Sequence, residues 1–264
     1  MSSAAGGPLP DPGSPGSFCF DLGNTRAKLI WVPVAAEPRV LFTGRFEALI
    51  VALSSGDLQP VAKAVDQPRL ICSVREAEAA AELGRCLMGA SPVVVDPPHG
   101  LSIEVDEPES VGSDRLFAVR GALEHRPQNW IVVQVGTALT VDAVRWTGEQ
   151  GVFLGGAIAP GPRLLSEALN AGGARLPLVD PQPNVPATGG NTERALAAGI
   201  AIGLGGAAQA LVREIAREAG WPAAPVMLTG GARGFVRAAL GEGPGALHEE
   251  EHLVARGMAA GYGA

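Results

Sequence analysis

The sequence predicts an α/β fold built from two similar halves, and three features support this. A strand, a small polar glycine turn and a second strand occur near residue 20, and the same pattern recurs near residue 134. In each half, short apolar runs alternate along the chain with alanine-rich segments of helical period. Hydrophobic residues make up 47% of the 264 residues and charged residues 18%, which is enough apolar material for a packed core.

The first half contains five short apolar segments that we expect to be strands. They cover residues 18–22, 27–34, 69–74, 92–95 and 101–105. A loop-and-helix stretch is expected between the second and third of these, and the alanine-rich spacing over 76–90 predicts a helix. A further helix is predicted over 110–123, and it carries Asp114 and Arg115 in its early turns.

The second half begins where the opening pattern returns, over residues 129–144. A third short strand is predicted at 151–156, and a long alanine-rich helix at 191–220. The apolar run 226–229 predicts a buried strand that leads into a third glycine turn, Gly230-Gly231.

The predicted boundaries give two domains and a tail. Residues 1–16 are rich in glycine, proline and serine, so we expect a disordered N-terminal tail. The domains are predicted to span 17–126 and 127–264, with a hinge near 124–129. The tail lacks the basic and apolar regions of a signal peptide.

Composition argues against several classes of protein. A net charge of −7 argues against a nucleic-acid partner, because phosphate backbones require clustered lysine and arginine. The cysteines and histidines show no metal-ligand spacing and no disulfide framework. We expect no membrane-spanning segment and no membrane partner, and therefore a cytoplasmic protein.

The two glycine turns are candidate phosphate-binding sites. Aligning them pairs the following residues: Gly23 with Gly136, Asn24 with Thr137, and Asp21 with Gln134. Glycines let backbone N–H groups approach phosphate oxygens closely, and threonine hydroxyls add further donors. A carboxylate at a strand end, such as Asp21, can hold a hydrated Mg²⁺. The alternative is two ordinary hairpins, since glycine and asparagine are common hairpin-turn residues.

Five motifs in order resemble one known family. They are DLGNT at 21–25 with Lys28, Pro108 followed by VGSDR at 111–115, GTALT at 136–140 with Asp142, GGAIAPG at 155–161, and Asn191-Thr192. Over residues 18–260 the chain resembles the type III pantothenate kinases of the actin/hexokinase/Hsp70-like ATPase superfamily. The resemblance implies two ribonuclease-H-like (actin-like ATPase) domains with a nucleotide cleft between them, and a homodimer. It also implies ATP-dependent phosphorylation of pantothenate to 4′-phosphopantothenate, the first step towards coenzyme A, with Mg²⁺ and a monovalent cation, K⁺ or NH₄⁺.

The resemblance implies a role for each matching residue. The ATP phosphates would be bound by Asp21, Gly23, Asn24, Thr25, Lys28, Gly136, Thr137 and Thr140. Pantothenate would be bound by Val105, Gly112, Ser113, Asp114, Arg115 and Thr192. Asp114 would be the general base for the pantothenate hydroxyl, Asp21 would hold Mg²⁺, and Gln134 would lie at the monovalent-cation site. Without the resemblance, the favoured interpretation of Asp114 is a solvated helix residue or a partner of Arg115.

Two positions depart from the family pattern. Gln134 stands where the family normally has an aspartate that helps to hold the monovalent cation, and Val105 stands where a tyrosine usually lines the pantothenate pocket. Two hypotheses follow: an active kinase with an altered cation site, or a catalytically impaired relative that acts as a binding or regulatory protein. A phosphatase or polyphosphate enzyme of the same superfamily is a third possibility, without motif support.

Overall fold

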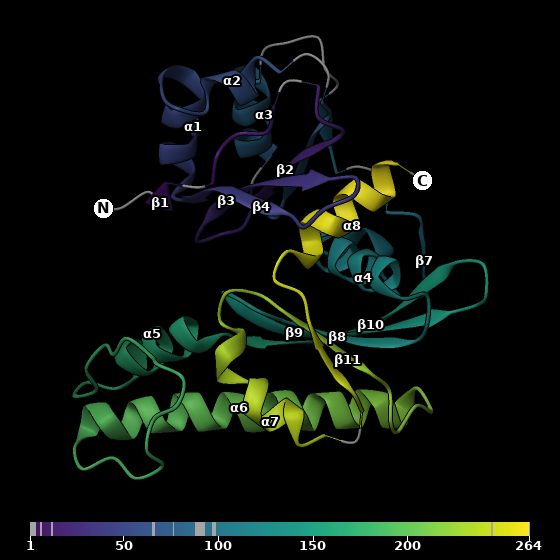
Figure 1. The fold of residues 1–264 in the computed structure, drawn as a ribbon. Coiled ribbons are helices and arrows are strands. Elements are labelled where there is room, and N and C mark those ends of the chain that lie inside the picture. Colours follow the sequence, from purple (N-terminus) through teal and green to yellow (C-terminus); the bar gives the residue numbers. More distant parts are fainter. Residues whose placement is uncertain are drawn as a thin grey trace. The chain divides into compact units, whose positions relative to one another are not determined.

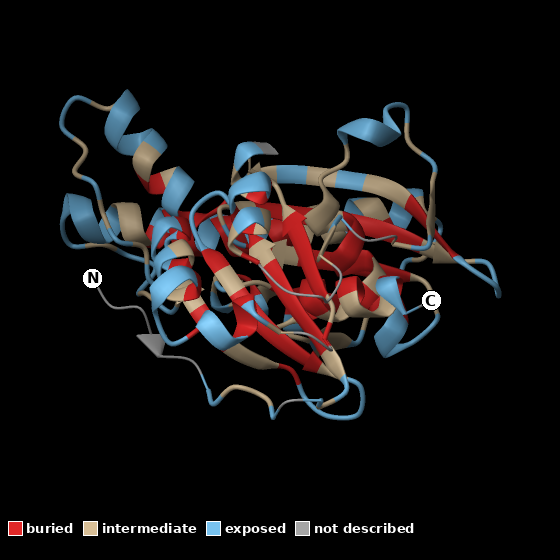
Figure 2. Ribbon diagram, turned by 90° about the horizontal axis from the view of Figure 1, so that it is seen from above, coloured by how far each residue is buried: buried red, intermediate tan, exposed pale blue. Residues whose placement is uncertain are grey.

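The computed structural model describes residues 4–5, 7–11, 13–64, 67–75, 77–87, 93–96, 99–243 and 245–263. The chain divides into two compact units, each a β-sheet with helices against it (Figure 1). Unit 1 comprises residues 1–101, 109–125 and 252–264, and unit 2 comprises 102–108 and 126–251. In both units the buried residues follow the strands of the sheet (Figure 2).

The sheet of unit 1 is mixed. Its strands lie in the order β1 (Ala4–Ala5), β4 (Arg39–Gly44), β3 (Ala27–Pro33), β2 (Gly16–Leu22), β5 (Arg69–Ser73) and β6 (Val93–Val95). The hairpin pairs β2–β3 and β3–β4 are antiparallel, whereas β5 is parallel to β2 and β6 is parallel to β5. The chain therefore makes a meander first and then returns to the other side of β2.

Helices cover both faces of this sheet (Figure 1). On one face α1 (Phe46–Ser55), α2 (Gln59–Ala62) and α3 (Ala77–Cys86) pack on a core that includes Phe20, Leu22 and Trp31. On the other face lie α4 (Ser113–His125), preceded by the 3₁₀ turn η1 (Pro108–Ser110), and α8 (Leu253–Tyr262). Because side chains alternate along a strand, Cys19 and Asp21 of β2 point towards this second face. The Cys19 thiol accordingly donates to the Ala255 carbonyl of α8.

Unit 2 repeats this connectivity. Its strands lie in the order β12 (Leu247–Glu249), β11 (Val226–Thr229), β8 (Trp130–Val135), β9 (Ala138–Trp146), β10 (Gly151–Pro160) and β7 (Leu101–Ile103). Strands β8, β9 and β10 form an antiparallel meander, and β11 and β12 extend it with parallel pairs. Its helical elements are α5 (Pro162–Gly172), α6 (Thr192–Glu218), η2 (Arg233–Phe235) and α7 (Arg237–Gly241), of which α6 and α7 contribute to its main apolar core.

The registers of the two sheets support the alignment of Asp21 with Gln134. Asp21 lies opposite Lys28 on β3 and Cys72 on β5. Gln134 lies opposite residues 140 and 229 on the corresponding strands β9 and β11. The turns themselves differ in length, since four residues separate the last paired residues of β2 and β3 and three separate those of β8 and β9.

The α/β class and the two similar halves are confirmed. All the predicted strands form, and three predicted helices are found as α3, α4 and α6. Part of the predicted helix 76–90 lies outside the described residues. The strands and α-helices not anticipated are β1, β4, α5, α7, β12 and α8.

The two units differ from the predicted domains, 17–126 and 127–264, in two segments. Residues 252–264 belong to unit 1, because α8 packs against α4 and β2. Residues 102–108 belong to unit 2, because they run along the β9–β10 hairpin, where the Glu104 N–H donates to the Phe153 carbonyl.

The predicted disordered tail contains some regular structure. Residues 1–3, 6 and 12 lie outside the described residues. Ala4–Ala5 nevertheless form β1, which pairs antiparallel with β4, and Leu9 packs against the core of unit 1. The expectation of disorder is therefore wrong for these positions, because the edge of β4 offers backbone partners that composition does not reveal.

Helix α6 changes the expectation about membranes. It is long and apolar enough to cross a bilayer by length and composition, and 33% of its most apolar window is buried. The core helices of soluble proteins pass the same test, so this helix alone is weak evidence for a membrane. It does leave an unusually apolar surface on unit 2.

The contact between α4 and α8 depends on two glycines. A Cβ atom at Gly257 would collide with the backbone carbonyl of Phe117, and one at Gly121 would collide with that of Leu253. The two helix backbones thus approach more closely than any other side chain permits. This contact fixes α4, which carries Asp114 in its first turn.

We expect Gly257→Ala to lower the free energy of unfolding by about 1–3 kcal/mol, the usual cost of overpacking a close contact. Urea unfolding followed by circular dichroism would measure it. Gly84→Ala on α3 is the matched control, because nothing lies within 4 Å of the added methyl group. Equal stability of the two variants would contradict this account of the α4–α8 contact.

Candidate active site

The first part of the site lies at the end of β2 in unit 1. Asp21 is the penultimate residue of this strand, and the turn 23–26 follows it. Burial raises the pKa of the Asp21 carboxyl, the charge of Lys28 opposes this rise, and the charge of Asp114 adds to it. Unit 1 therefore brings together three residues predicted from the sequence: Asp21, Lys28 and Asp114.

Asp114 is held by the first turn of α4. Its Oδ1 accepts a hydrogen bond of 2.9 Å from the Arg115 backbone N–H. A Cβ atom on Gly112 would lie 2.8 Å from the same oxygen, so glycine leaves the space that this carboxylate uses. Burial raises the pKa of Asp114, and the N–H and charge of Arg115 partly offset the rise. The carboxyl is partly buried, which argues against a solvated helix residue.

Ser113 and Cys72 lie beside these carboxyl groups. The Ser113 Oγ and Cys72 Sγ atoms are 3.5 Å apart. Burial and the nearby charges of Asp21 and Asp114 raise the pKa of the Cys72 thiol well above its ordinary value. Cys72 is therefore a neutral, buried side chain beneath the site and is not suited to be a nucleophile.

Arg75 was not anticipated from the sequence. It follows β5, and its Nη1 lies 3.5 Å from the Gly23 carbonyl and 3.3 Å from the Asn24 carbonyl. Its guanidinium also stacks over the Phe46 ring, 5.1 Å from the ring centroid. Nothing in the spacing of a single arginine predicts bonds to carbonyl groups some fifty residues earlier in the chain.

The corresponding part of unit 2 consists of three glycine turns around the end of β8. The Gly136 N–H donates to the Ala138 carbonyl at 2.8 Å, and the Gly161 N–H donates to the Thr137 carbonyl at 2.9 Å. Gly230 has φ of +96°, and a Cβ atom there would collide with the Val135 carbonyl. Only glycine fits such a backbone position without strain.

Gln134 and Thr140 are cross-strand partners behind these turns. The Gln134 Oε1 and Thr140 Oγ1 atoms are both buried, and among the described residues neither has a hydrogen-bond partner. Buried polar atoms normally have partners, so these two oxygens are suited to a bound water or a monovalent cation. Such a site would lack a carboxylate at position 134.

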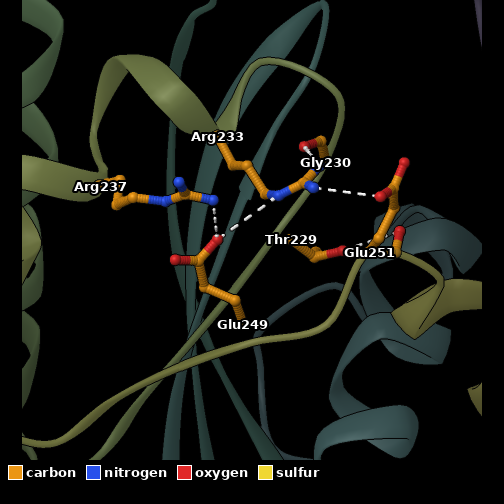
Figure 3. A network of polar contacts seen from close by, with 6 residues as sticks. All are labelled: Thr229, Gly230, Arg233, Arg237, Glu249 and Glu251. Atoms are coloured by element: carbon orange, nitrogen blue, oxygen red, sulfur yellow. Dashed lines mark hydrogen bonds and ion pairs between the residues drawn. The ribbon is translucent and has the colours of Figure 1, made fainter.

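An ion-pair network supports the third glycine turn (Figure 3). Arg233 Nη1 donates to the Gly230 carbonyl at 3.2 Å, and its Nη2 lies 3.1 Å from Glu251 Oε2. Glu249 Oε2 lies 3.5 Å from Arg233 Nε and 2.6 Å from Arg237 Nη2. Sequence reasoning missed this network, which ties the turn to the segment that follows β12.

The remaining predicted residues lie in unit 2. Val105 lies beside Gly155, where a Cβ atom would be 3.3 Å from its Cγ1. Thr192 begins α6, whose N-cap is Asn191, with Oδ1 accepting from the Arg194 N–H at 2.9 Å. Thr192 also lines an apolar cavity of about 470 Å³ between α5 and α6. Val105 and Thr192 therefore belong to a different unit from Asp114, which lies in unit 1.

No group of three or more histidine, cysteine, aspartate or glutamate side chains gathers to hold a metal in the part of the chain that the structure describes. Unit 1 offers at most a pair of interacting carboxyl groups at this strand end, Asp21 and Asp114. This fits Mg²⁺, which often takes one or two carboxylates and completes its shell with waters and substrate phosphates.

The chain is similar in sequence to the type III pantothenate kinases. A family model described as type III pantothenate kinase matches residues 17–214. The type III pantothenate kinase of Halorhodospira halophila is 41% identical over 141 residues, which are 53% of this chain and 54% of that protein. That of Thermus thermophilus is 40% identical over 134 residues, 50% and 51% of the two chains. The chain thus spans about half the length of the curated relatives it matches.

Two solved structures share the fold. The ethanolamine utilization protein EutJ from Carboxydothermus hydrogenoformans has a TM-score of 0.51 at 16% identity, covering 97% of this chain and 91% of that one. A Sinorhizobium meliloti protein named as a 2-dehydro-3-deoxygalactonokinase has a TM-score of 0.52 at 16% identity, covering 93% and 97%. Both support the two-domain actin-like α/β fold. Because the family model matches well over half of its residues, the chain belongs to the type III pantothenate kinase family.

Proposed function

We propose that the protein transfers the γ-phosphoryl group of ATP to the hydroxyl of pantothenate, giving 4′-phosphopantothenate, the first step towards coenzyme A. The observation that carries this proposal is the pair of partly buried carboxyl groups, Asp21 and Asp114, in unit 1. Burial raises the pKa of both, and Asp114 contributes to the shift at Asp21. Shifted carboxyl groups beside a glycine turn are typical of a catalytic site.

The ATP phosphates are proposed to bind at the two glycine turns. The residues are Asp21, Gly23, Asn24, Thr25 and Lys28 in unit 1, and Gly136, Thr137 and Thr140 in unit 2. Backbone N–H groups, hydroxyls and the lysine ammonium supply the donors that phosphate oxygens require. Mg²⁺, when bound, neutralises charge on the transferring phosphoryl group. Asp21 would hold it, since a carboxylate oxygen is a preferred ligand.

Asp114 is proposed as the general base for the pantothenate hydroxyl. A raised pKa makes its carboxylate a better proton acceptor than an ordinary surface aspartate. The Arg115 N–H bond at 2.9 Å orients one oxygen, which leaves the other for the hydroxyl. Pantothenate is proposed to bind to Gly112, Ser113 and Arg115 of unit 1 and to Val105 and Thr192 of unit 2.

The proposed function predicts that Mg·ATP yields ADP faster when pantothenate is present. Asp114→Asn should lower kcat by about 10²–10⁴, the usual contribution of a general base, and should leave ATP binding intact. The assay measures ADP release with and without pantothenate. Asp57→Asn is the matched control, because Asp57 is exposed on a loop of unit 1. A wild-type protein that binds pantothenate without turnover would instead support the impaired, binding relative.

Burial of Asp21 also predicts a stability effect with a definite sign. Because its pKa is raised in the folded state, the protonated carboxyl favours folding below the unfolded pKa. That contribution is lost as the pH rises through the folded-state pKa. Asp21→Asn should therefore raise Tm by about 2 °C or more at pH 8, with a difference that vanishes near pH 4. A lower Tm for Asp21→Asn at pH 8, measured by calorimetry, would contradict the burial effect.

The monovalent cation is proposed to interact with neutral oxygens only. Gln134 Oε1 and Thr140 Oγ1 would hold K⁺ or NH₄⁺, and neither supplies a full negative charge. Because an amide dipole binds a cation more weakly than a carboxylate does, we propose that the native protein depends little on K⁺.

We expect Gln134→Asp to gain a several-fold stimulation of kcat/KM by K⁺ over Na⁺, on the order of the charge effect of one carboxylate. Gln182→Asp, in an exposed loop, is the matched control. Strong K⁺ dependence in the native protein would overturn the prediction. So would a Gln134→Asp variant that only loses thermal stability, because Gln134 would then be a packing residue.

A homodimer and a cytoplasmic location are also proposed. Five large apolar side chains are exposed on or near the elements that line the cavity: Ile158, Leu164, Leu169, Leu178 and Ile202. Ile202 on α6 is 52% exposed, and burial of such a surface favours association. Unit 2 therefore presents an apolar face suited to a second copy of this chain.

Light scattering at micromolar concentration should give about twice the chain mass of 26.9 kDa. Ile202→Glu should shift the protein to monomer, because the interface would bury an unpaired charge. Val51→Glu, at an exposed position on α1, is the control and should leave the mass unchanged. A monomeric wild type would overturn the proposed homodimer. Recovery of the protein only from detergent-extracted membranes would overturn the proposed cytoplasmic location.

A further inference from the structure

Arg75 is held in place by contacts of its backbone and of its side chain. Its guanidinium lies over the ring of Phe46, a buried residue at the start of α1. Its backbone N–H donates to the Ser73 Oγ at 3.2 Å. Its Nη1 approaches the carbonyl oxygens of Gly23 and Asn24, in the turn after Asp21. An arginine supported on an aromatic ring loses little further freedom when it forms such bonds.

These bonds determine where the N–H groups of the turn point. A trans peptide is planar, so its C=O and the N–H of the next residue point in opposite directions. The described part of the chain contains no cis peptide bond. When the Gly23 carbonyl points towards Arg75, the Asn24 N–H points away from it, and the Asn24 carbonyl and Thr25 N–H are related in the same way. Successive N–H groups on one side of a turn form a concave site for an anion.

The positive charge of Arg75 also favours anion binding at the turn. No acidic side chain in the part of the chain that the structure describes forms an ion pair with its guanidinium. Its positive charge therefore remains to attract an anion at the turn. Lys28, across from Asp21 on β3, is a further cation of this region. Arg75 is half-buried, so its charge is screened by solvent less than that of an exposed arginine.

We propose that Arg75 is a positioning residue for nucleotide phosphate: it holds the two carbonyls of the 23–26 turn so that the opposite N–H groups face the phosphate. This inference rests on the proposed function, in that the turn binds ATP. It adds a residue outside the five motifs. Arg75 acts through the turn and is not proposed to contact the pantothenate hydroxyl.

Two variants separate the geometry of the guanidinium from its charge. Arg75→Gln removes the charge and the long reach to both carbonyls, and should weaken Mg·ATP binding by about 10-fold or more, the usual effect of losing charged hydrogen bonds. Arg75→Lys keeps the charge but loses the planar guanidinium that lies over the Phe46 ring, and should give an intermediate loss. Adenosine, which has no phosphate, should bind both variants as it binds the wild type.

Titration calorimetry with Mg·ATP and with adenosine, together with Tm, tests the proposal. Arg85→Gln on α3 is the matched control, because Arg85 is exposed and lies in the same unit. A selective loss of ATP affinity in Arg75→Gln supports the inference, since general damage to unit 1 would weaken adenosine too. The inference is overturned if the ratio of ATP affinity to adenosine affinity is the same in Arg75→Gln as in the wild type. It is also overturned if the wild type binds ATP no more tightly than adenosine. Wild-type protein that binds ATP but does not phosphorylate pantothenate would refute the proposed function and leave this test valid.

Discussion

The contact between α4 and α8 is the constraint on which the candidate site in unit 1 depends. Gly121 and Gly257 let the two helix backbones touch, and α8 in turn lies against β2 through Cys19. Through α8, the position of α4 is therefore fixed relative to β2, the strand that carries Asp21. Because Asp114 lies in the first turn of α4, this packing sets how the two carboxyl groups influence one another.

The two similar sheets carry different side chains at equivalent positions. In unit 1 the end of the central strand carries a partly buried carboxyl and a lysine across from it. In unit 2 the same register positions carry Gln134 and Thr140, whose oxygens are neutral. The strand-turn-strand framework thus recurs in both units, whereas only unit 1 has charged side chains at these paired positions. The turn lengths diverged as well, which gives each unit its own arrangement of N–H groups.

The sequence predicted most of the framework and part of the site. The paired strands around each turn were predictable because β-runs and a glycine turn are local signals, and α6 because its alanine-rich period is long. Helix α8 was not, since Gly257 lowers helix propensity and is explained only by tertiary packing. Asp21 and Asp114 were recognisable from their motifs, but their raised pKa values depend on burial. Arg75 and Arg233 bond to carbonyl groups, and such bonds leave no pattern in sequence.

Unit 1 is discontinuous along the chain, and this has a consequence for synthesis. Apart from residues 102–108, all of unit 2 lies between α4 and α8, so the ribosome completes unit 2 before it makes the helix that covers Cys19 and Phe117. During that interval the second face of the first sheet lacks α8 and exposes apolar surface. Nascent chains with such exposed surface are prone to aggregation and bind chaperones. Unit 1 is therefore the first unit to be started by the ribosome, and α8, the last helix of the chain, completes it.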